Sequence, residues 1–325
     1  MRNKLCTILF LGLIFFASCD KTDEYYIYND MVSQYELLKE IVMVNTTNAA
    51  TGLETVFTET VTDSADQAEL TQAFIEPVRY LQDESGYFFV ESYNAWMVAH
   101  ATKPELIGTY RYDVQDENGK YYVRDMVSTI RYIGYGFIEY YFENPDNDVV
   151  ERKLAFVKAI PAAEFFIGSG FYGDQPNYYY ERDDANAVIV VETTRSFADG
   201  IGGVFENHYS DSLERVRFCR ELINHVRFFD NQSGYFFMYD FDCVNVAHGT
   251  QKDLQGQNLY DYQDSKGNYV IRELVEIAKN EGYGYYEYWW NNPVTGQEEP
   301  KMAWVTKVPG IDYLIGSGIY LTENN

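Results

Sequence analysis

The chain has 325 residues, which is enough for two domains of ordinary size that each bury a hydrophobic core. It carries 25 basic and 50 acidic residues, a formal net charge of -25, and this excludes a broad nucleic-acid-binding surface. An anionic ligand therefore requires a local pocket of positive charge. The 31 Tyr and 21 Phe suit strand packing and aromatic-lined pockets equally well.

The first residues have the pattern of an export signal. Arg2 and Lys4 precede an apolar stretch over 5–17, which is too short to cross a bilayer. Phe16-Ala17-Ser18-Cys19 resembles the lipobox of bacterial lipoproteins, with Phe at the position usually held by Leu. We therefore expect a signal peptide over 1–18, lipidation of Cys19 and a tether over 19–24. A secreted protein without lipid is the alternative.

Helices are predicted at the start of each half of the remaining chain. The stretches 32–44 and 65–81 have helical character, and 211–229 is their later counterpart. Val216, Cys219, Ile223 and Val226 recur at three- and four-residue spacing, which predicts one buried helix face. Cys219 and Cys243 face an oxidising compartment if the chain is exported, so they form either a disulfide or two buried thiols.

Short aromatic and β-branched runs predict strands after these helices. In the first half the runs lie at 87–90, 96–99, 136–142, 154–160 and 165–172. A turn at 116–119 precedes a predicted helix over 120–132. Gly168-Ser169-Gly170 has no Lys-Ser/Thr after it, so we interpret it as a close-packed strand and not a phosphate loop. This order predicts an α+β fold with an antiparallel sheet in each half.

An internal repeat organises the chain. Adding 148 to a residue number aligns the first half with the second without a gap, at about 40% identity over the hundred or so residues from Phe74. Gly86-Tyr87-Phe88-Phe89, for example, returns as Gly234-Tyr235-Phe236-Phe237. The period is domain-sized, so we expect a first repeat over 25–173 and a second repeat over 174–325, with the boundary near 173–177.

The order of motifs resembles that of the Cache family, the PAS-like extracytoplasmic sensing modules of chemoreceptors and histidine kinases. In the second repeat the motifs are Arg227-Phe228, Gly234 to Phe237, Val246 to His248, Asp264 to Gly267, Gly282 to Tyr288, Pro300-Lys301, Pro309-Gly310 and Ile315 to Tyr320. The first repeat departs at Arg152-Lys153 and Pro161-Ala162, where the family has Pro-Lys and Pro-Gly. The resemblance implies two tandem PAS-like modules, each with a long N-terminal helix and a sheet of about five strands. It also implies a small-molecule pocket between the sheet and the crossing segment.

Ten residues are candidate ligand contacts, five in each repeat: Arg227, Tyr235, His248, Tyr288 and Lys301, and their counterparts Arg79, Tyr87, His100, Tyr140 and Lys153. The arginines either hold a carboxylate through two parallel hydrogen bonds or form an ion pair between helices or between helix and sheet. The histidines either donate to an anion or are satisfied, half-buried residues. The lysines either supply a point charge or lie solvated at a strand edge, and the tyrosines either offer hydroxyls or pack in the core.

Two further sets of charged residues have structural explanations. Arg124 and Arg272 lie beside Asp125 and Glu273, so surface ion pairs are favoured over a ligand role. Asp113 with Asp116, and Asp261 with Asp264, lack the spacing of an EF-hand, so turn and cap chemistry is favoured over calcium binding. No nucleophile-elbow or zinc-protease motif occurs, and we expect no catalytic residue, metal or cofactor.

These observations predict a lipid-anchored, extracytoplasmic small-molecule-binding protein of the bacterial cell envelope, periplasmic or on the cell surface. The resemblance implies a short organic carboxylate, amino acid or amine as ligand. Without a signalling output of its own, the protein would act through a sensor kinase, chemoreceptor or transporter. The alternative is an adaptor with vestigial pockets that binds a receptor, a transporter or a glycan.

Overall fold

The computed structural model describes residues 31–174 and 177–321, and the chain from Val32 onward forms one compact unit. The expected signal peptide, lipidation site and tether lie outside the described residues. Within the described ranges, no helix combines the length and apolar character needed to cross a membrane.

Both repeats contain the same elements in the same order. The first consists of α2 (Gln34–Glu59), α3 (Ser64–Ile75), β2 (Phe88–Ser92), β3 (Met97–His100), α4 (Tyr122–Tyr132), β4 (Tyr135–Asn144), β5 (Val149–Ile160) and β6 (Phe165–Tyr172). The second consists of α5 (Arg182–Asn207), α6 (Ser212–Asn224), β8 (Phe237–Asp240), β9 (Asn245–His248), α7 (Val270–Asn280), β10 (Tyr283–Asn291), β11 (Glu298–Lys307) and β12 (Tyr313–Tyr320). Short strands β1 (Met31–Ser33) and β7 (Tyr179–Glu181) pair ahead of the long helices.

Each repeat builds one five-stranded sheet. The strand orders are β3-β2-β6-β5-β4 and β9-β8-β12-β11-β10, with antiparallel neighbours throughout. The predicted α+β class, the long N-terminal helix and the sheet of about five strands are therefore confirmed. Close packing of Gly168-Ser169-Gly170 in β6 is confirmed as well, because a Cβ at Gly168 would overlap the Phe89 ring.

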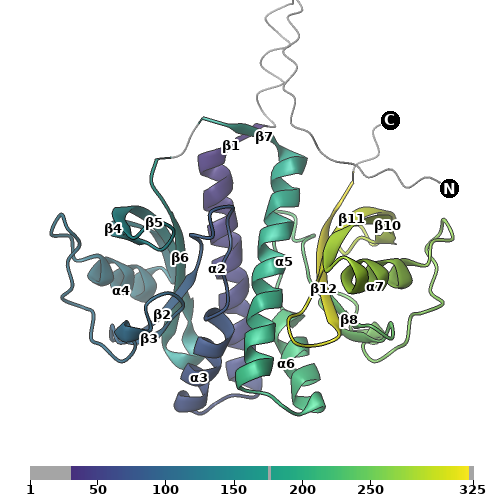
Figure 1. Ribbon diagram of the computed structural model, residues 1–325, viewed down its shortest axis with the longest axis horizontal. Helices are drawn as coiled ribbons and strands as arrows, with labels where there is room; N and C mark the ends of the chain where they lie inside the picture. The colour runs from purple at the N-terminus through teal and green to yellow at the C-terminus, as the bar shows by residue number, and fades with distance from the viewer. Residues whose placement is uncertain (1–30, 175–176, 322–325) are drawn as a thin grey trace, which may run out of the picture. The chain divides into compact units, whose positions relative to one another are not determined.

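The two repeats share a core. Figure 1 shows α2 and α5 side by side between the two sheets, with α4 and α7 on the outer faces. Helix α2 packs on α6 of the other repeat, where Gly52 lets Leu222 approach closely. The matched contact joins Gly200 of α5 to Phe74 of α3. Each helix pair is thus completed by the other repeat, and only the outer layers have separate hydrophobic clusters.

Several predicted boundaries differ from the observed ones. The predicted helix 32–44 begins at Gln34 but continues to Glu59, because packing against α5 and α6 supports a polar stretch with low helix propensity. The predicted helix 65–81 ends at Ile75, two residues before Pro77, which lacks an N–H to continue it. For α5, the long N-terminal helix of the second repeat, no residue range was predicted.

The two cysteines of the second repeat are free thiols. Cys219 and Cys243 are both buried, and burial raises the pKa of each. Of the two alternatives for this pair, the structure therefore shows the buried thiols.

Candidate functional site

The outer face of each sheet carries the candidate residues, beneath α4 in the first repeat and α7 in the second. In β2, Phe88 and Val90 point toward the central helices, whereas Phe89 and Glu91 alternate to the outer face. Strand β8 alternates in the same way. The two-residue period of the strands therefore decides which side chains face the outer layer.

Lys301 lies in the middle of the second-repeat site. In the sheet register it pairs with Tyr288 of β10 on one side and Tyr320 of β12 on the other. Its side chain is 0% exposed, and Nζ donates a 2.9 Å hydrogen bond to the hydroxyl of Tyr235. The hydroxyls of Tyr235 and Tyr320 are 3.1 Å apart. The expectation of a solvated strand-edge lysine is therefore wrong, because the neighbouring strands and their aromatic rings enclose this position.

Lys153 occupies the same place in the first repeat. It is also 0% exposed, and its Nζ lies 3.9 Å from the centroid of the Tyr87 ring. The hydroxyls of Tyr87 and Tyr172 are 3.0 Å apart, close to the 3.1 Å of the second repeat, but among the described residues Lys153 Nζ has no hydrogen-bond partner. Burial lowers the pKa of both lysines well below the usual range. Each ammonium would gain from an anion placed beside it.

His248 is fully buried beside Lys301. Its Nδ1 accepts hydrogen bonds from the backbone N–H groups of Thr250 and Gln251, at 3.3 and 3.0 Å. The neutral ring therefore carries its proton on Nε2, which makes no hydrogen bond within the described residues. The ring stacks between Phe237 and Trp290. Burial, followed by the charge of Lys301, lowers the pKa of His248 to about 3.

His100 repeats this arrangement in the first repeat. Its Nδ1 accepts from the N–H groups of Thr102 and Lys103, at 3.3 and 3.0 Å. Burial, followed by the charge of Lys153, lowers the pKa of His100 to about 3 as well. The expectation of half-buried histidines is thus corrected. Both rings are buried and neutral, and each retains a free N–H donor.

The two candidate arginines hold backbone instead of acidic side chains. Arg227 donates to the carbonyls of Val226 and Gly249, and Arg79 donates to those of Val78 and Ala101. Both arginines follow the end of a helix, in the loop before the first strand of the sheet. Among the described residues, neither Arg79 nor Arg227 therefore forms the ion pair that was the alternative to ligand contact. The arginines instead fix the loop that follows each buried histidine.

The candidate tyrosines on β4 and β10 are buried. Tyr140 stacks on Tyr122 with ring centroids 4.4 Å apart, and Tyr288 meets Trp290 edge to face at 5.8 Å. Burial raises the pKa of both tyrosines well above the usual range. They are core aromatics that also bring a hydroxyl to the outer layer.

A carboxylate turn fixes the loop that covers each site. Asp264 accepts from the N–H groups of Lys266 and Asn268 through one oxygen, and from Trp289 of β10 through the other. Asp116 makes the matching bonds in the first repeat. Over the described ranges no group of three or more His, Cys, Asp or Glu could hold a metal ion. The predicted turn chemistry is confirmed for Asp116 and Asp264, whereas Asp113 and Asp261 form ion pairs with arginines.

The surface arginines pair with a different partner from the expected one. Arg124 of α4 bonds Asp113 and Arg272 of α7 bonds Asp261, so each pair joins the helix to the loop that precedes it. Asp125 instead lies 3.5 Å from Lys120. Adjacent residues on a helix do not face each other, so the expected pairing with the next residue was wrong.

Comparison with known protein families identifies the family to which this fold belongs. The Cache domain family matches residues 33–323. This chain belongs to the Cache domain family. It is a small-molecule sensor domain like those of chemoreceptors and kinases, and the fold is non-catalytic.

Curated relatives are similar to part of this Cache chain. The sensor histidine kinase MctS of Rhizobium johnstonii is 38% identical over 92 residues, which are 28% of this chain and 20% of that protein. The methyl-accepting chemotaxis protein CtpM of Pseudomonas aeruginosa is 36% identical over 93 residues, which are 28% of this chain and 16% of that protein. The matched Cache region spans about a fifth or less of each relative.

Solved structures are also similar to this Cache chain. A methyl-accepting chemotaxis protein from Vibrio parahaemolyticus is 25% identical with a TM-score of 0.39, over 44% of this chain and 93% of that one. The sensor domain of the V. cholerae histidine kinase DctB is 9% identical with a TM-score of 0.25, over 93% of each chain.

Sequence reasoning did not single out three outer-layer positions at which the two Cache repeats differ. The first-repeat residues and their second-repeat counterparts are Glu91 and Tyr239, Arg111 and Leu259, and Tyr122 and Val270. The internal alignment contained this signal: Arg111 and Tyr122 have the apolar counterparts Leu259 and Val270, and the acid Glu91 is replaced by Tyr239. The half of each site around the lysine and histidine is nearly unchanged.

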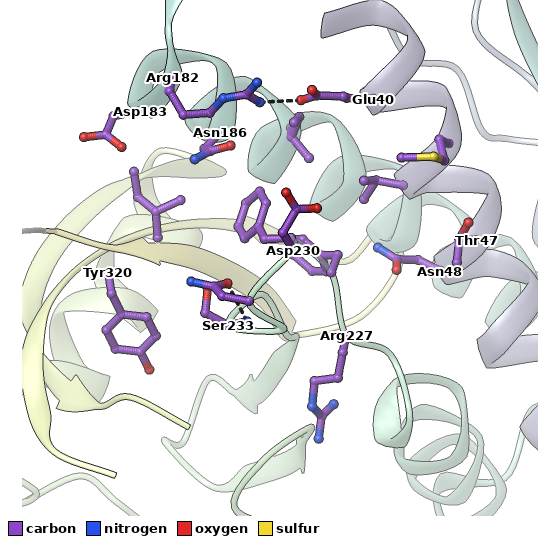
Figure 2. A pocket seen from close by; sticks show the side chains of 17 residues that line it. Glu40, Thr47, Asn48, Arg182, Asp183, Asn186, Arg227, Asp230, Ser233 and Tyr320 are labelled. Atoms are coloured by element: carbon purple, nitrogen blue, oxygen red, sulfur yellow. Dashed lines mark hydrogen bonds and ion pairs between the residues drawn. The ribbon is translucent and has the colours of Figure 1, made fainter. Parts of the chain in front are cut away.

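A cavity of about 700 Å³ lies between α2, α5 and the loop 228–233, and neither Lys153 nor Lys301 is among the residues that line it. Figure 2 shows Arg182 bonded to Glu40 above it, at 2.7 Å, and Arg227 extending away from that pair. Tyr320 lines this cavity and also bonds Tyr235. Of the candidate ligand contacts, Arg227 alone lines the cavity.

Proposed function

We propose that this Cache chain is an extracytoplasmic receptor that binds a short organic carboxylate on the outer face of its sheets. The observation that carries the proposal is the pair of fully buried lysines, Lys153 and Lys301, each enclosed by aromatic rings. Among the described residues, neither lysine forms an ion pair. A buried ammonium without an acid is costly unless an anion joins it.

The groups around each lysine suit a carboxylate. In the second repeat, Lys301 supplies a point charge, Tyr235 a hydroxyl, and His248 an unused Nε2–H. Because these donors are shielded from water, their attraction for an anion is stronger than at the surface. A ligand of about six heavy atoms, at roughly 1.5 kcal/mol each at most, has an affinity limit of about 9 kcal/mol. We therefore expect dissociation constants in the micromolar range.

Location and signalling partners form the second part of the proposal. Export and a lipid anchor at Cys19 rest on residues 1–19, and a sensor kinase or chemoreceptor partner rests on the kinds of protein that match. Metabolic labelling with an alkyne fatty acid tests the anchor. Label should enter the wild-type protein and be absent from Cys19→Ala, and equal labelling of both would refute the lipid site.

The binding test is isothermal titration of a soluble form, residues 20–325, with acetate, propionate, pyruvate, amines, amino acids and sugars. Lys153→Met should abolish carboxylate binding in the first repeat, and Lys301→Met should abolish it in the second. The matched controls are Lys158→Met on β5 and Lys307→Met on β11, which change half-exposed lysines on the same strands. The proposal fails if no small carboxylate binds folded protein, or if the control variants lose binding as fully as the buried ones.

A further inference from the structure

A polar cavity lies between the two long helices and the loop 228–233 of the second repeat. Its volume of about 700 Å³ falls within the range of about 300–1,000 Å³ that is usual for small-molecule pockets. Figure 2 shows side chains of α2, of α5 and of the loop around it. Because α2 belongs to the first repeat and the other two walls to the second, the cavity exists only where the repeats meet.

Two charged side chains of α5 close the matched space in the first repeat. Glu192 Oε2 accepts a 2.9 Å hydrogen bond from the backbone N–H of Leu81. Arg195 Nη2 donates to the backbone carbonyl of Arg79 at 3.3 Å. These two side chains therefore supply the loop 80–85 with one acceptor and one donor.

The second repeat lacks both of these side chains. At the two matched positions α2 has Val44 and Thr47, which are shorter and uncharged. The matching backbone groups are the N–H of Phe229 and the carbonyl of Arg227, and among the described residues neither has a hydrogen-bond partner. Phe229 and Arg227 both line the cavity. A molecule in the cavity would satisfy this loop if it brought an acceptor for the N–H and a donor for the carbonyl.

Neutral polar side chains also line this cavity. Asn48 is 1% exposed, and its Nδ2 donates to the hydroxyl of Thr193 at 3.2 Å, whereas its Oδ1 accepts no hydrogen bond within the described ranges. The side chains of Asn186 and Thr47 form no hydrogen bond with any described residue. An amide offers both donors and an acceptor, and so does a hydroxyl. These groups suit a ligand that can donate and accept at several points.

The charged side chains at this cavity favour a neutral ligand. Arg182 is paired with Glu40 at 2.7 Å, and the Arg227 guanidinium donates to backbone carbonyls. Asp183 and Asp230 are exposed and have no ion-pair partner in the part of the chain that the structure describes. Their negative charge repels an anion, and water screens their attraction for a cation.

We propose that this cavity binds a neutral sugar of one or two rings. Neighbouring hydroxyls of the sugar accept from the Phe229 N–H and donate to the Arg227 carbonyl, the two roles that charged side chains have in the first repeat. Further hydroxyls bond Asn48 and Asn186, and the C–H groups of the ring contact the apolar side chains on the same walls. This binding site is additional to the proposed carboxylate sites and does not depend on them.

The first test is saturation-transfer difference NMR on the soluble form, residues 20–325, followed by titration. The neutral probes are glucose, galactose, mannose, N-acetylglucosamine, maltose and cellobiose. Glucuronate, glucosamine and serine test an anion, a cation and a zwitterion. We expect at least one neutral sugar to bind at least about tenfold more tightly than each of the three charged probes.

The second test fills the cavity with residues that the first repeat already uses. Val44→Glu combined with Thr47→Arg copies the pair that closes the first repeat, and should weaken the sugar at least about tenfold. Asn186→Leu copies Leu38 of the first repeat and removes one hydrogen-bonding group, so it should weaken the sugar about three- to tenfold. The matched control is Thr58→Arg, an exposed position of α2 outside the cavity, which should leave the affinity within about twofold of wild type.

Three results would overturn the inference: no neutral sugar binds folded protein, a charged probe binds as tightly as the neutral sugars, or the filled variants bind sugar as well as the control. The probe comparison needs no substitution, so a folding defect of a variant leaves it decisive. Titration of the same samples with butyrate keeps the two proposals apart. Carboxylate binding without sugar binding overturns only this inference, and sugar binding without carboxylate binding overturns only the proposed function.

Discussion

Lys301 donates a 2.9 Å hydrogen bond to the hydroxyl of Tyr235, and the same ammonium lies 4.0 Å from the centroid of that ring. Its counterpart Lys153 keeps the ring contact with Tyr87, but its ammonium has no hydrogen-bond partner in the part of the chain that the structure describes. The two repeats therefore bury the same cation with unequal compensation. Replacing the two lysines should therefore change the free energy of unfolding by different amounts.

Replacing each buried lysine with methionine should have unequal effects. Lys153→Met should raise the free energy of unfolding by about 1 to 3 kcal/mol at pH 7, because it removes an uncompensated buried amine. Lys301→Met should gain less unfolding free energy, because the Tyr235 hydroxyl loses a hydrogen-bond partner. Urea denaturation measures both, with Lys158→Met expected within about 0.5 kcal/mol of wild type. A loss of stability in Lys153→Met would show that its ammonium is already well compensated.

Carboxylate affinity should fall as the pH rises. The anion binds the protonated lysine, and burial lowers the pKa of Lys153 and Lys301 well below the usual range. Above that lowered pKa, each further pH unit should weaken binding about tenfold, and binding should take up a proton. Titration from pH 6 to 9 in buffers of different ionisation enthalpy measures both effects. Constant affinity with no proton uptake would contradict the coupling to lysine.

The buried histidines should make the fold sensitive to acid. His100 and His248 have pKa values near 3 in the folded chain, below the usual 6.5 of the unfolded chain. The unfolded chain therefore binds more protons between these values, so stability is present above pH 6.5 and is lost as the pH falls toward 3. His248→Asn keeps an acceptor for the N–H of Gln251 and removes the titration. Its unfolding free energy should fall less steeply between pH 6 and 4, and an unchanged slope would refute this.

Glu91 should reduce the stability of the fold at alkaline pH, whereas the histidines reduce it at acidic pH. Its folded pKa of about 7 is above the usual 4.5, so its contribution to stability is full below pH 4.5 and is lost as the pH rises through 7. Glu91→Gln should therefore be more stable than wild type at pH 8, by about 1 to 3 kcal/mol, and lose this advantage at pH 5. Urea titrations at the two pH values provide the measurement. Greater destabilisation of Glu91→Gln at pH 8 than at pH 5 would reverse the expected sign.

The carboxylate turn should hold the covering loop. Asp264→Ala removes three backbone hydrogen bonds to one carboxylate and should cost about 2 to 4 kcal/mol. Asp261→Ala removes only an exposed ion pair and should cost less than about 1 kcal/mol. Hydrogen exchange should report faster exchange of the Trp289 and Asn268 amides in Asp264→Ala. Equal effects of the two substitutions would contradict a structural role for Asp264.

The strands, the repeat and the turn could be predicted from local signals. The 148-residue offset and the two-residue alternation depend only on residue order, and the carboxylate turn depends on Asp followed closely by Gly. The continuation of α2 beyond 44 could not be predicted this way. Its Asn- and Thr-rich stretch is helical only because α5 and α6 cover it.

The sequence by itself determined the α+β class, the duplication and most of the residues that surround each buried lysine, because these follow from periodicity and from matching the chain with itself. Only the tertiary structure decided that Lys153 and Lys301 are buried, that the arginines bond backbone carbonyls, and that the Oε2 of buried Glu91 has no hydrogen-bond partner within the described ranges. Burial and hydrogen-bond partners depend on strands and helices far apart in the chain. No local pattern of residues contains that information.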